Sequence, residues 1–467
     1  MRDAAILARL QFAFTVSFHI IFPTISIGLA LYLAVFEGLW LKTKDAVYLQ
    51  IYKFWRNIFA MAFGVGVVTG IVLSFEFGLG FAKFAKLAGP IIGPMIGLEV
   101  LTAFFLEAGF LGIMLFGLNR VGPRLHFFAT CMVALGTVLS ASWIMSANSW
   151  MQTPDGVAWE SGRLVVEDWW RVVANPSWPV RLPHMLCAAY LTGSFLVAGV
   201  GAWYVLNKKH QAFGRRTVSL GMAIGSVLIA GQVFIGDILY GTMLKYQPAK
   251  MQAAEGFWDK QSVSPAPYLW VIIPDQKNQR NLFELGTPRL GSIWLTHSLN
   301  GRVEGLKNTL VPDQPLMETV FYGFRVMYVI AIVMFSLAVA SLWLRWRGKL
   351  FSTRWFLIAL TCMTPSGIFA TLGGWYLAET GRQPYVVYGL LRTADAVSPV
   401  PAGTLLSSLI AFVVIYAVFF TAFLVFVIRA IRQGPNELLD VPVPSGSLKR
   451  ALRPKIVVSV LGEKPML

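Results

Sequence analysis

The stretch Gly374-Trp-Tyr-Leu-Ala-Glu379-Thr-Gly-Arg382-Gln-Pro-Tyr385 closes a long apolar segment of the sequence. It places a carboxylate, Glu379, and a guanidinium, Arg382, three residues apart, which is about one turn of a helix. Ionisable groups at the edge of an apolar span cost free energy and usually serve a function. The stretch therefore predicts a membrane-spanning helix that ends at a functional site.

The rest of the chain has the composition of a polytopic membrane protein. Of its 467 residues 56% are hydrophobic and 13% are charged, whereas a soluble protein carries about 25% charged residues. About 20 consecutive apolar residues cross a bilayer as a helix. We expect such spans at residues 11–36, 57–82, 91–118, 125–148, 184–207, 217–240, 318–344, 355–377 and 403–428. The sequence therefore predicts an all-α, polytopic membrane protein with about nine transmembrane helices, in a single membrane domain over residues 1–467.

Positive charges alternate along the connections between these spans. Lys and Arg gather in every second connection, and cytoplasmic loops of membrane proteins are enriched in both. We therefore expect the N-terminus outside and a cytoplasmic tail at residues 429–467, with Lys83 and Lys86 as exceptions. These loops account for the net charge of +16, so nucleic acid is not an expected partner. The longest polar stretch, residues 241–317, is expected to be a functional extracytoplasmic loop.

Histidines inside predicted spans are candidate metal ligands. His19 lies in the first span, and His184 follows Pro183 at the expected start of the fifth, where Pro suits the first helical turn. Each could instead be hydrogen-bonded to a neighbouring helix or lie at the membrane interface. The other three histidines are interpreted as surface or interface residues: His126, His210 and His297. No Cys-x-x-Cys-His occurs, which excludes covalent c-type haem attachment.

Met327 and Arg325 lie together in the seventh span. A lone Met in a membrane helix usually belongs to the core. A buried guanidinium, however, needs an anion. The pair therefore indicates either ordinary packing or the neighbourhood of an anionic cofactor.

Two carboxylates in the third span, Glu99 and Glu107, are eight residues apart and so lie on roughly one side of a helix. Such a pair inside a membrane suits a proton relay or metal ligation. With a rise of about 1.5 Å per residue, His19, Glu99 and Met327 lie about 12 Å from the outer face, and Glu107 about 12 Å further toward the cytoplasm. The positions predict metal centres near the outer face with a carboxylate on their inner side.

Seven stretches, taken in this order, resemble subunit I of the cytochrome bd-type quinol oxidases. They cover essentially the whole chain and comprise Arg9 to His19, Glu99 to Glu107, Asn148 to Pro154, Pro183-His184, Gln247 to Glu255, Phe324 to Met327 and Gly374 to Tyr385. The last is similar to the family signature Gly-Trp-x-x-x-Glu-x-Gly-Arg-Gln-Pro-Trp. Tyr385 replaces its final Trp, a mild change because both residues supply an aromatic ring with a polar tip.

The resemblance implies a low-spin haem b held by His184 and Met327. A His and a Met together make a six-coordinate electron-transfer site. By the same resemblance, Arg325 would neutralise the propionates of this haem.

The resemblance also implies two further haems. Glu379 would hold a high-spin haem b, which Arg382 would stabilise. His19 and Glu99 would hold haem d, and Arg9 is a further cofactor-binding candidate. The quinol loop looks short and resembles the short-loop, cyanide-insensitive branch of the family, so whether the oxygen site holds haem d or another haem b stays open.

The reaction implied is the oxidation of quinol and the reduction of O2 to water. Residues 241–317 would form the quinol-binding loop, with Lys250 and Glu255 as its quinol-interacting residues, and a carboxylate such as Glu255 can accept the quinol proton. Quinol protons would leave outside, and protons for O2 would come from the cytoplasm through Glu107, Ser140 and Glu99. Proton motive force would then arise without pumping.

The resemblance implies several partners: subunit II of the oxidase, a small single-span subunit, ubiquinol or menaquinol, and O2. The expected location is the bacterial cytoplasmic (inner) membrane. Two alternatives remain. A multi-pass transporter should show internal repeats, which the sequence does not. A quinone-linked cytochrome b without oxygen chemistry usually carries paired histidines, whereas only His19 and His184 lie in predicted spans.

Overall fold

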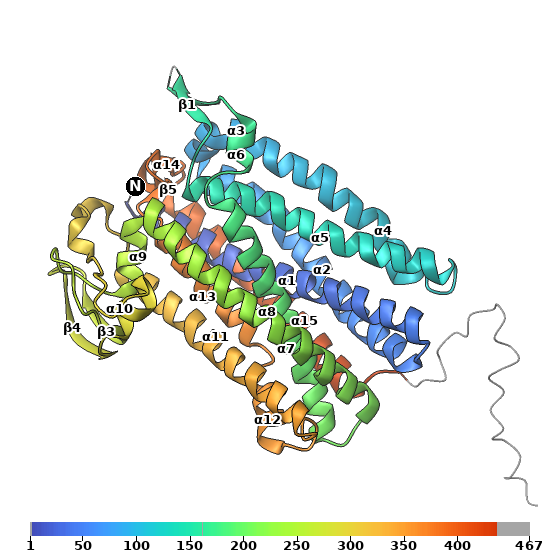
Figure 1. Ribbon diagram of the computed structural model, residues 1–467. Helices are drawn as coiled ribbons and strands as arrows, with labels where there is room; N and C mark the ends of the chain where they lie inside the picture. The colour runs from blue at the N-terminus through green and yellow to red at the C-terminus, as the bar shows by residue number, and fades with distance from the viewer. Residues whose placement is uncertain (1, 161, 437–467) are drawn as a thin grey trace, which may run out of the picture.

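The predicted spans are present as helices. The computed structural model describes residues 2–160 and 162–436, and within them eight helices are long and apolar enough to cross a membrane, with one bent pair as a ninth span. The eight are α1 (Arg2–Thr43), α2 (Ala46–Gly80), α5 (Pro123–Gln152), α7 (Trp178–Leu206), α8 (Gln211–Tyr246), α11 (Met317–Trp346), α15 (Ala402–Gln433) and the run from α3 (Ala82–Glu99) through the π-helix η1 (Val100–Phe104) to α4 (Phe105–Phe116). The bent pair, α12 (Arg354–Cys362) and α13 (Ser366–Thr380), meets at 45°. The all-α membrane architecture is therefore confirmed (Figure 1).

Most helices extend beyond the spans predicted from hydropathy. The fifth begins at Trp178, so Pro183 lies inside α7, and the expectation that it begins the helix is wrong. Pro179 occupies the first turn instead, where the missing N–H costs no hydrogen bond. His184 consequently lies in the second turn of α7.

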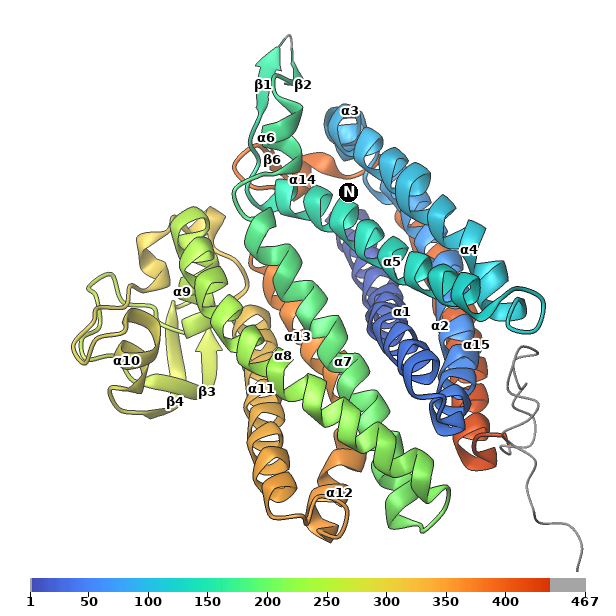
Figure 2. The ribbon, with the colours of Figure 1, turned by 45° about the vertical axis from the view of Figure 1, so that its right-hand side comes forward.

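Helices α1 and α7 form the centre of the bundle. In their most apolar windows 61% and 72% of the residues are buried, against a third or less in the other single-helix spans. Gly28 and Gly193 face each other where α1 and α7 cross, and a Cβ added to either would lie within 3.0 Å of the other's backbone. Small residues allow membrane helices this close approach. Figure 2 shows α1, α2, α4, α5 and α15 on one side of this contact, and α7, α8, α11, α12 and α13 on the other.

The irregular segments gather at one end of the bundle, which we call the loop end (Figures 1 and 2). Between α8 and α11 the chain forms α9 (Pro248–Glu255), the antiparallel strands β3 (Tyr268–Asp275) and β4 (Arg280–Thr287), α10 (Leu290–Thr296) and the 3-10 turns η2 (Leu306–Asn308) and η3 (Val311–Asp313). Two smaller hairpins add β1 (Val157–Glu160), β2 (Arg163–Val166), α6 (Trp169–Val173), β5 (Tyr385–Val387), β6 (Leu391–Arg392) and α14 (Thr393–Ala396). The side of the membrane that this end faces stays a prediction. Of the expected tail, residues 437–467 lie outside the described residues.

Candidate functional site

A partly buried carboxylate, Glu379, lies at the C-terminal end of α13, next to the loop end. Its Oε1 accepts hydrogen bonds from Asn148 Nδ2 at 3.0 Å and from Gln152 Nε2 at 3.2 Å, both in the last turns of α5. Its Oε2 accepts a hydrogen bond from Arg382 at 2.5 Å. Asn148 and Gln152 are four residues apart, so one face of α5 presents both amides. The two charged residues of the signature stretch therefore form a direct ion pair.

Three basic side chains surround this one carboxylate. Arg181 is buried and donates hydrogen bonds to Asn148 Oδ1 at 2.7 Å and to a serine hydroxyl of α5 at 3.2 Å. Lys250, which is 2% exposed, reaches in from α9 and donates to Gln152 Oε1 at 2.5 Å. The Nε and NH1 atoms of Arg382 are buried without a hydrogen-bond partner among the described residues.

This cluster carries an excess of positive charge. Burial lowers the pKa of Lys250 well below its ordinary value, and the charge of Arg181 lowers it further. Even with Lys250 neutral, two guanidiniums face the single carboxylate of Glu379. Because buried cations need anions, the cluster fits a ligand that carries carboxylate groups, such as a haem with its propionates.

The other end of α9 holds a second buried ion pair. Glu255 Oε2 is 3.7 Å from the NH2 atom of Arg325, and both side chains are at most 4% exposed. Arg325 also donates to two backbone carbonyls of the loop at 2.6 and 3.2 Å, and its guanidinium lies 4.4 and 4.2 Å from the ring centroids of Tyr268 and Phe321. Burial raises the pKa of Glu255 to about 7, although Arg325 acts in the opposite direction. The eight-residue α9 thus connects two charged sites through Lys250 and Glu255.

His184 and Met327 lie between two hydrophobic clusters. One cluster joins α7, α8, α11 and α12, and the other joins the ends of α8 and α11 to α9 and the loop. Gly236 lies beside the His184 ring and Gly374 beside Met327 Sδ, where an added Cβ would stand 3.6 and 3.0 Å away. His184 Nε2 is 3.3 Å from the amide nitrogen of Gln232, and His184 Nδ1 is buried without a partner among the described residues.

The hydrogen bonds of His19 select one tautomer. Its Nδ1 lies 2.9 Å from Thr69 Oγ1, and that hydroxyl lies 2.9 Å from the carbonyl oxygen of Val65. A hydroxyl has one proton, so when Thr69 donates it to the carbonyl it accepts the N–H of His19 Nδ1. His19 Nε2 is then left with its lone pair, which is the arrangement of a histidine ligand oriented by a second residue.

Helix α5 orders the acidic residues along its length. Ser140 Oγ donates to Glu99 Oε1 at 2.7 Å. One turn further from the loop end, Gly136 faces Glu107 so closely that an added Cβ would overlap the Glu107 side chain. Asn148, which contacts the third carboxylate, lies eight residues from Ser140 in the other direction, about 12 Å along the helix. The expected order, with Glu107 furthest from the loop end, is therefore present along α5.

The predicted shared face of Glu99 and Glu107 is altered by the helix between them. Glu99 ends α3 and is followed directly by η1, which has π-helical geometry. A π-helical insertion changes the angular offset of the residues that flank it, and such insertions are frequent at functional sites. Both carboxylates nevertheless contact α5.

The interpretation of His126 as a surface or interface residue is wrong. The side chain is fully buried, with Nδ1 2.5 Å from Glu37 Oε1 and Nε2 3.1 Å from the carbonyl oxygen of Met114. The C-terminal end of α4 covers it, which the position of His126 near a helix start did not reveal. His210 and His297 are exposed, as expected, and Arg9 is exposed on the first turns of α1.

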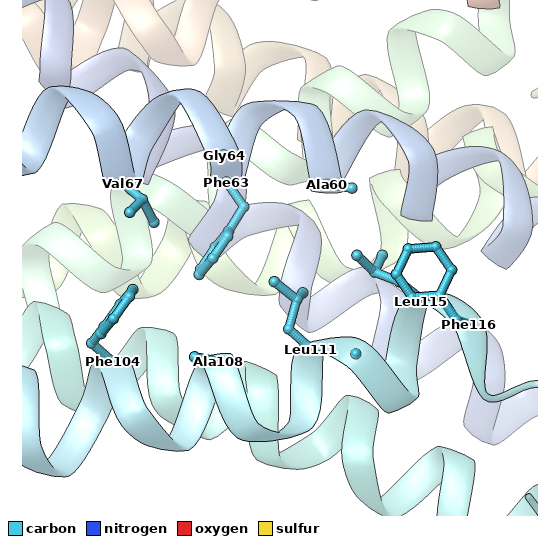
Figure 3. A pocket seen from close by; sticks show the side chains of 10 residues that line it. Ala60, Phe63, Gly64, Val67, Phe104, Ala108, Leu111, Leu115 and Phe116 are labelled. Atoms are coloured by element: carbon cyan, nitrogen blue, oxygen red, sulfur yellow. The ribbon is translucent and has the colours of Figure 1, made fainter.

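An apolar groove lies between α2 and α4 (Figure 3). Phe63 and Phe104 point toward each other across it. The other lining residues are Ala60, Gly64, Val67, Ala108, Leu111, Gly112, Leu115 and Phe116. Because all ten lining residues are apolar, the groove suits hydrocarbon or another helix, and the charged clusters lie elsewhere.

Comparison with known proteins gives the class of the molecule. The family model for cytochrome bd terminal oxidase subunit I matches residues 7–435. The chain is 36% identical over 450 residues to cytochrome bd ubiquinol oxidase subunit 1 of Bacillus subtilis, covering 94% of this chain and 96% of the relative. It is 30% identical to cytochrome bd-II ubiquinol oxidase subunit 1 of Escherichia coli, with 94% and 98% covered.

A solved structure agrees with these matches. The bd oxidase from Geobacillus thermodenitrificans aligns with a TM-score of 0.86 and 29% identity, covering 93% of this chain and 99% of that chain. These likenesses define a membrane-embedded subunit of a terminal quinol oxidase that uses haem and works with a second subunit. The chain belongs to the cytochrome bd terminal oxidase subunit I family.

Several residues of the charged cluster were missed by sequence reasoning. Arg181, Asn148 and Gln152 all contribute to the surroundings of Glu379, and none was singled out as a candidate. Asn148 and Gln152 lie in the stretch Asn148 to Pro154 that resembles the family, and their spacing, four residues apart before a predicted loop, was a further signal. Thr69, which orients His19, lies on another helix and left no local signal.

Proposed function

We propose that this subunit catalyses electron transfer from a quinol, bound against α9, to O2 bound deeper in the bundle. The observation that carries the proposal is α9 itself, which places Lys250 beside the Glu379 cluster and Glu255 beside Arg325, two residues before Met327. A quinol bound at this helix would contact both a hydrogen-bond donor, Lys250, and a proton acceptor, Glu255. The haems, when bound, would supply the electron transfer and the oxygen binding.

The ligand assignments rest on the surroundings of each side chain. His184 and Met327 would hold a low-spin haem b, supported by the glycines beside both side chains. The NH2 atom of Arg325, which is 3.7 Å from Glu255 Oε2 and has no hydrogen-bond partner among the described residues, would also serve a propionate. These features fit the group, since a buried guanidinium needs an anion.

The other two haems would lie with Glu379 and with His19. Glu379 would hold a high-spin haem b, with the unpaired Nε and NH1 atoms of Arg382 available to propionates. His19, whose Nε2 is left free by Thr69, and Glu99 would hold the haem at the oxygen site. Whether this third haem is haem d or haem b is decided by the spectrum proposed below.

Proton movements follow from where the carboxylates lie. Glu255, with its pKa near 7, would take a proton from quinol at the loop end. Glu107 and then Ser140 with Glu99 would pass protons toward the oxygen site from the other end of α5. With the loop end outside the cytoplasm, release and uptake on opposite sides would make the reaction electrogenic without pumping.

The expected setting is the bacterial inner membrane, in a complex with subunit II and with a small single-span subunit. The relatives differ in the quinol that their names give: two are named as ubiquinol oxidases, and a third, also from Bacillus subtilis, is named as a putative menaquinol oxidase. We propose that the apolar groove between α2 and α4 receives a helix of subunit II, because its lining is wholly apolar.

A dithionite-reduced minus air-oxidised spectrum of the purified complex tests the proposal, together with pyridine haemochrome analysis. A far-red chlorin band beside b-type bands supports haem d at the oxygen site. Bands of b-type haem alone support the haem-b-only branch. The absence of any haem signal would contradict the proposed oxidase function and would favour the alternative of a multi-pass transporter.

A further inference from the structure

The amide of Gln152 connects the proposed quinol loop to the carboxylate of Glu379. Gln152 is fully buried at the end of α5. Its Oε1 accepts a hydrogen bond from Lys250 Nζ at 2.5 Å, and its Nε2 donates to Glu379 Oε1 and to the carbonyl oxygen of Ala378, each at 3.2 Å. One side chain thus contacts α9 and the end of α13 at the same time.

The partners of Gln152 fix the orientation of its amide. An amine or ammonium of Lys250 donates, so the amide oxygen faces α9, and the NH2 group must then face Glu379. The reverse orientation would set the NH2 group against Lys250 and the amide oxygen against the carboxylate. The contact with Lys250 therefore stabilises the hydrogen bond that Glu379 receives.

The other hydrogen bonds of Glu379 do not reach the loop. Asn148 is held by Arg181 of α7, and Arg382 follows Glu379 in sequence. Among the hydrogen bonds of the described residues, only the Gln152 contact joins Glu379 to a side chain of α9. A change in the hydrogen bonding of Lys250 can therefore reach Glu379 through this amide.

We propose that Gln152 is a positioning residue that couples the occupancy of the quinol loop to the iron site at Glu379. A quinol oxygen that accepts another N–H of Lys250 would draw Nζ away from Gln152 Oε1 and weaken that contact. The amide, once released, can rotate, and the carboxylate then loses a hydrogen bond. Since such hydrogen bonds tune the basicity of a carboxylate ligand, the reduction potential of the metal site changes. The inference rests on the proposed role of Glu379 as the ligand of the high-spin haem b.

A double-mutant cycle tests this coupling on the purified complex. Spectroelectrochemical titration measures the midpoint potential of the high-spin haem b in the native protein, in Lys250→Met, in Gln152→Leu and in the double variant. Gln152→Leu removes both hydrogen bonds of the amide without adding a charge beside Glu379. We expect Lys250→Met to shift the potential in the native background and to lose most of that shift beside Gln152→Leu.

Two results would overturn the inference: no shift on Lys250→Met, or an equal shift in both backgrounds, which would reveal a through-space charge effect. Gln252→Leu is the matched control. Gln252 is buried, as Gln152 is, but it lies in α9 and forms hydrogen bonds with Glu304 at 3.4 Å and with Thr309 at 3.3 Å. In the Gln252→Leu background, Lys250→Met should still shift the midpoint potential. A separate measurement, the spectrum of Glu379→Ala, tests whether Glu379 is a ligand of the high-spin haem b. If Glu379→Ala retains an unchanged high-spin haem b spectrum, Glu379 is no ligand, whatever the cycle gives.

Discussion

Ser140 Oγ donates a 2.7 Å hydrogen bond to Glu99 Oε1, and this contact joins the middle of α5 to the end of α3. Four residues before Ser140 on the same face of α5, Gly136 makes room for the side chain of Glu107. The hydroxyl therefore contacts one carboxylate and lies one helical turn along α5 from the glycine that faces the other. A hydroxyl both donates and accepts, which is the property that the proposed proton relay requires.

Replacement of Ser140 by Ala should slow O2 reduction while every haem is retained. Loss of a hydrogen bond to a carboxylate costs about 1.5–3 kcal/mol, and we expect turnover to fall roughly tenfold or more. The oxygen-site band in the reduced spectrum should also shift, because Glu99 loses the contact that orients it. Ser142→Ala is the control, since Ser142 Oγ donates to a carbonyl of its own helix at 2.7 Å. Unchanged spectra and rates in Ser140→Ala would exclude the hydroxyl from the site.

Replacement of Glu107 by Gln should lower turnover by about two orders of magnitude, the usual contribution of a positioned proton-transfer group. The amide keeps the fit against Gly136 but cannot carry a proton. Oxygen consumption with excess quinol measures the effect, and the visible spectrum should be that of the native protein. Glu318→Gln, at an exposed carboxylate in the first turn of α11, should retain full activity. Normal turnover in Glu107→Gln would end its proposed role.

Replacement of Met327 by Leu should convert the low-spin haem b to a different spin or ligand state. Leu fills a similar volume without a sulfur donor, so the fold is kept and the change is confined to the spectrum. The reduced-minus-oxidised difference spectrum measures it. Met334→Leu, two turns further along α11 and buried in the hydrophobic cluster, should leave the spectrum unchanged. An unaltered low-spin signal in Met327→Leu would remove Met327 as a ligand.

The quinol reaction should depend on the ionisation of Glu255. The proposed proton acceptor must be deprotonated, and with a pKa of about 7 its active fraction grows as pH rises. We expect kcat/KM for quinol to increase roughly tenfold between pH 6 and pH 8.

Arg325→Gln should move the inflection of this pH profile to higher pH, because Arg325 lowers the pKa of Glu255. Glu304→Gln, at an exposed carboxylate of the same loop, should leave the pH of that inflection unchanged. A flat profile in the native protein would exclude Glu255 as the proton acceptor.

Hydropathy predicted the number and order of the spans because burial in lipid requires long apolar helices. It did not predict their ends. Helix α7 begins at Trp178, six residues before the apolar run, since hydrogen bonding in a helix continues past the membrane surface wherever tertiary contacts support it. The expected position of Pro183 was wrong for this reason.

From the residues alone, the candidate site could be predicted only where a residue conflicts with its local surroundings, whereas Lys250 and Glu255, in a polar loop, were named through the family resemblance. Glu379 and Arg325 are charged residues at or inside apolar segments, and a single sequence reveals that conflict. Arg181 and Gln152 lie near a predicted loop, where polar residues are ordinary. Their importance comes from tertiary contacts, of Arg181 with α5 and of Gln152 with α9 and α13. The burial of His126 likewise depends on Glu37, 89 residues away.

The contact of Gly28 with Gly193 limits how far apart the two histidines proposed as haem ligands can lie. His19 lies nine residues before Gly28 on α1, and His184 lies nine residues before Gly193 on α7, so each histidine is about 14 Å along its helix from the crossing. Both helices run away from the loop end, which places the two histidines on the same side of that crossing. Electron tunnelling weakens steeply with distance. The two glycines thus hold the helices that carry His19 and His184 in direct contact at their crossing.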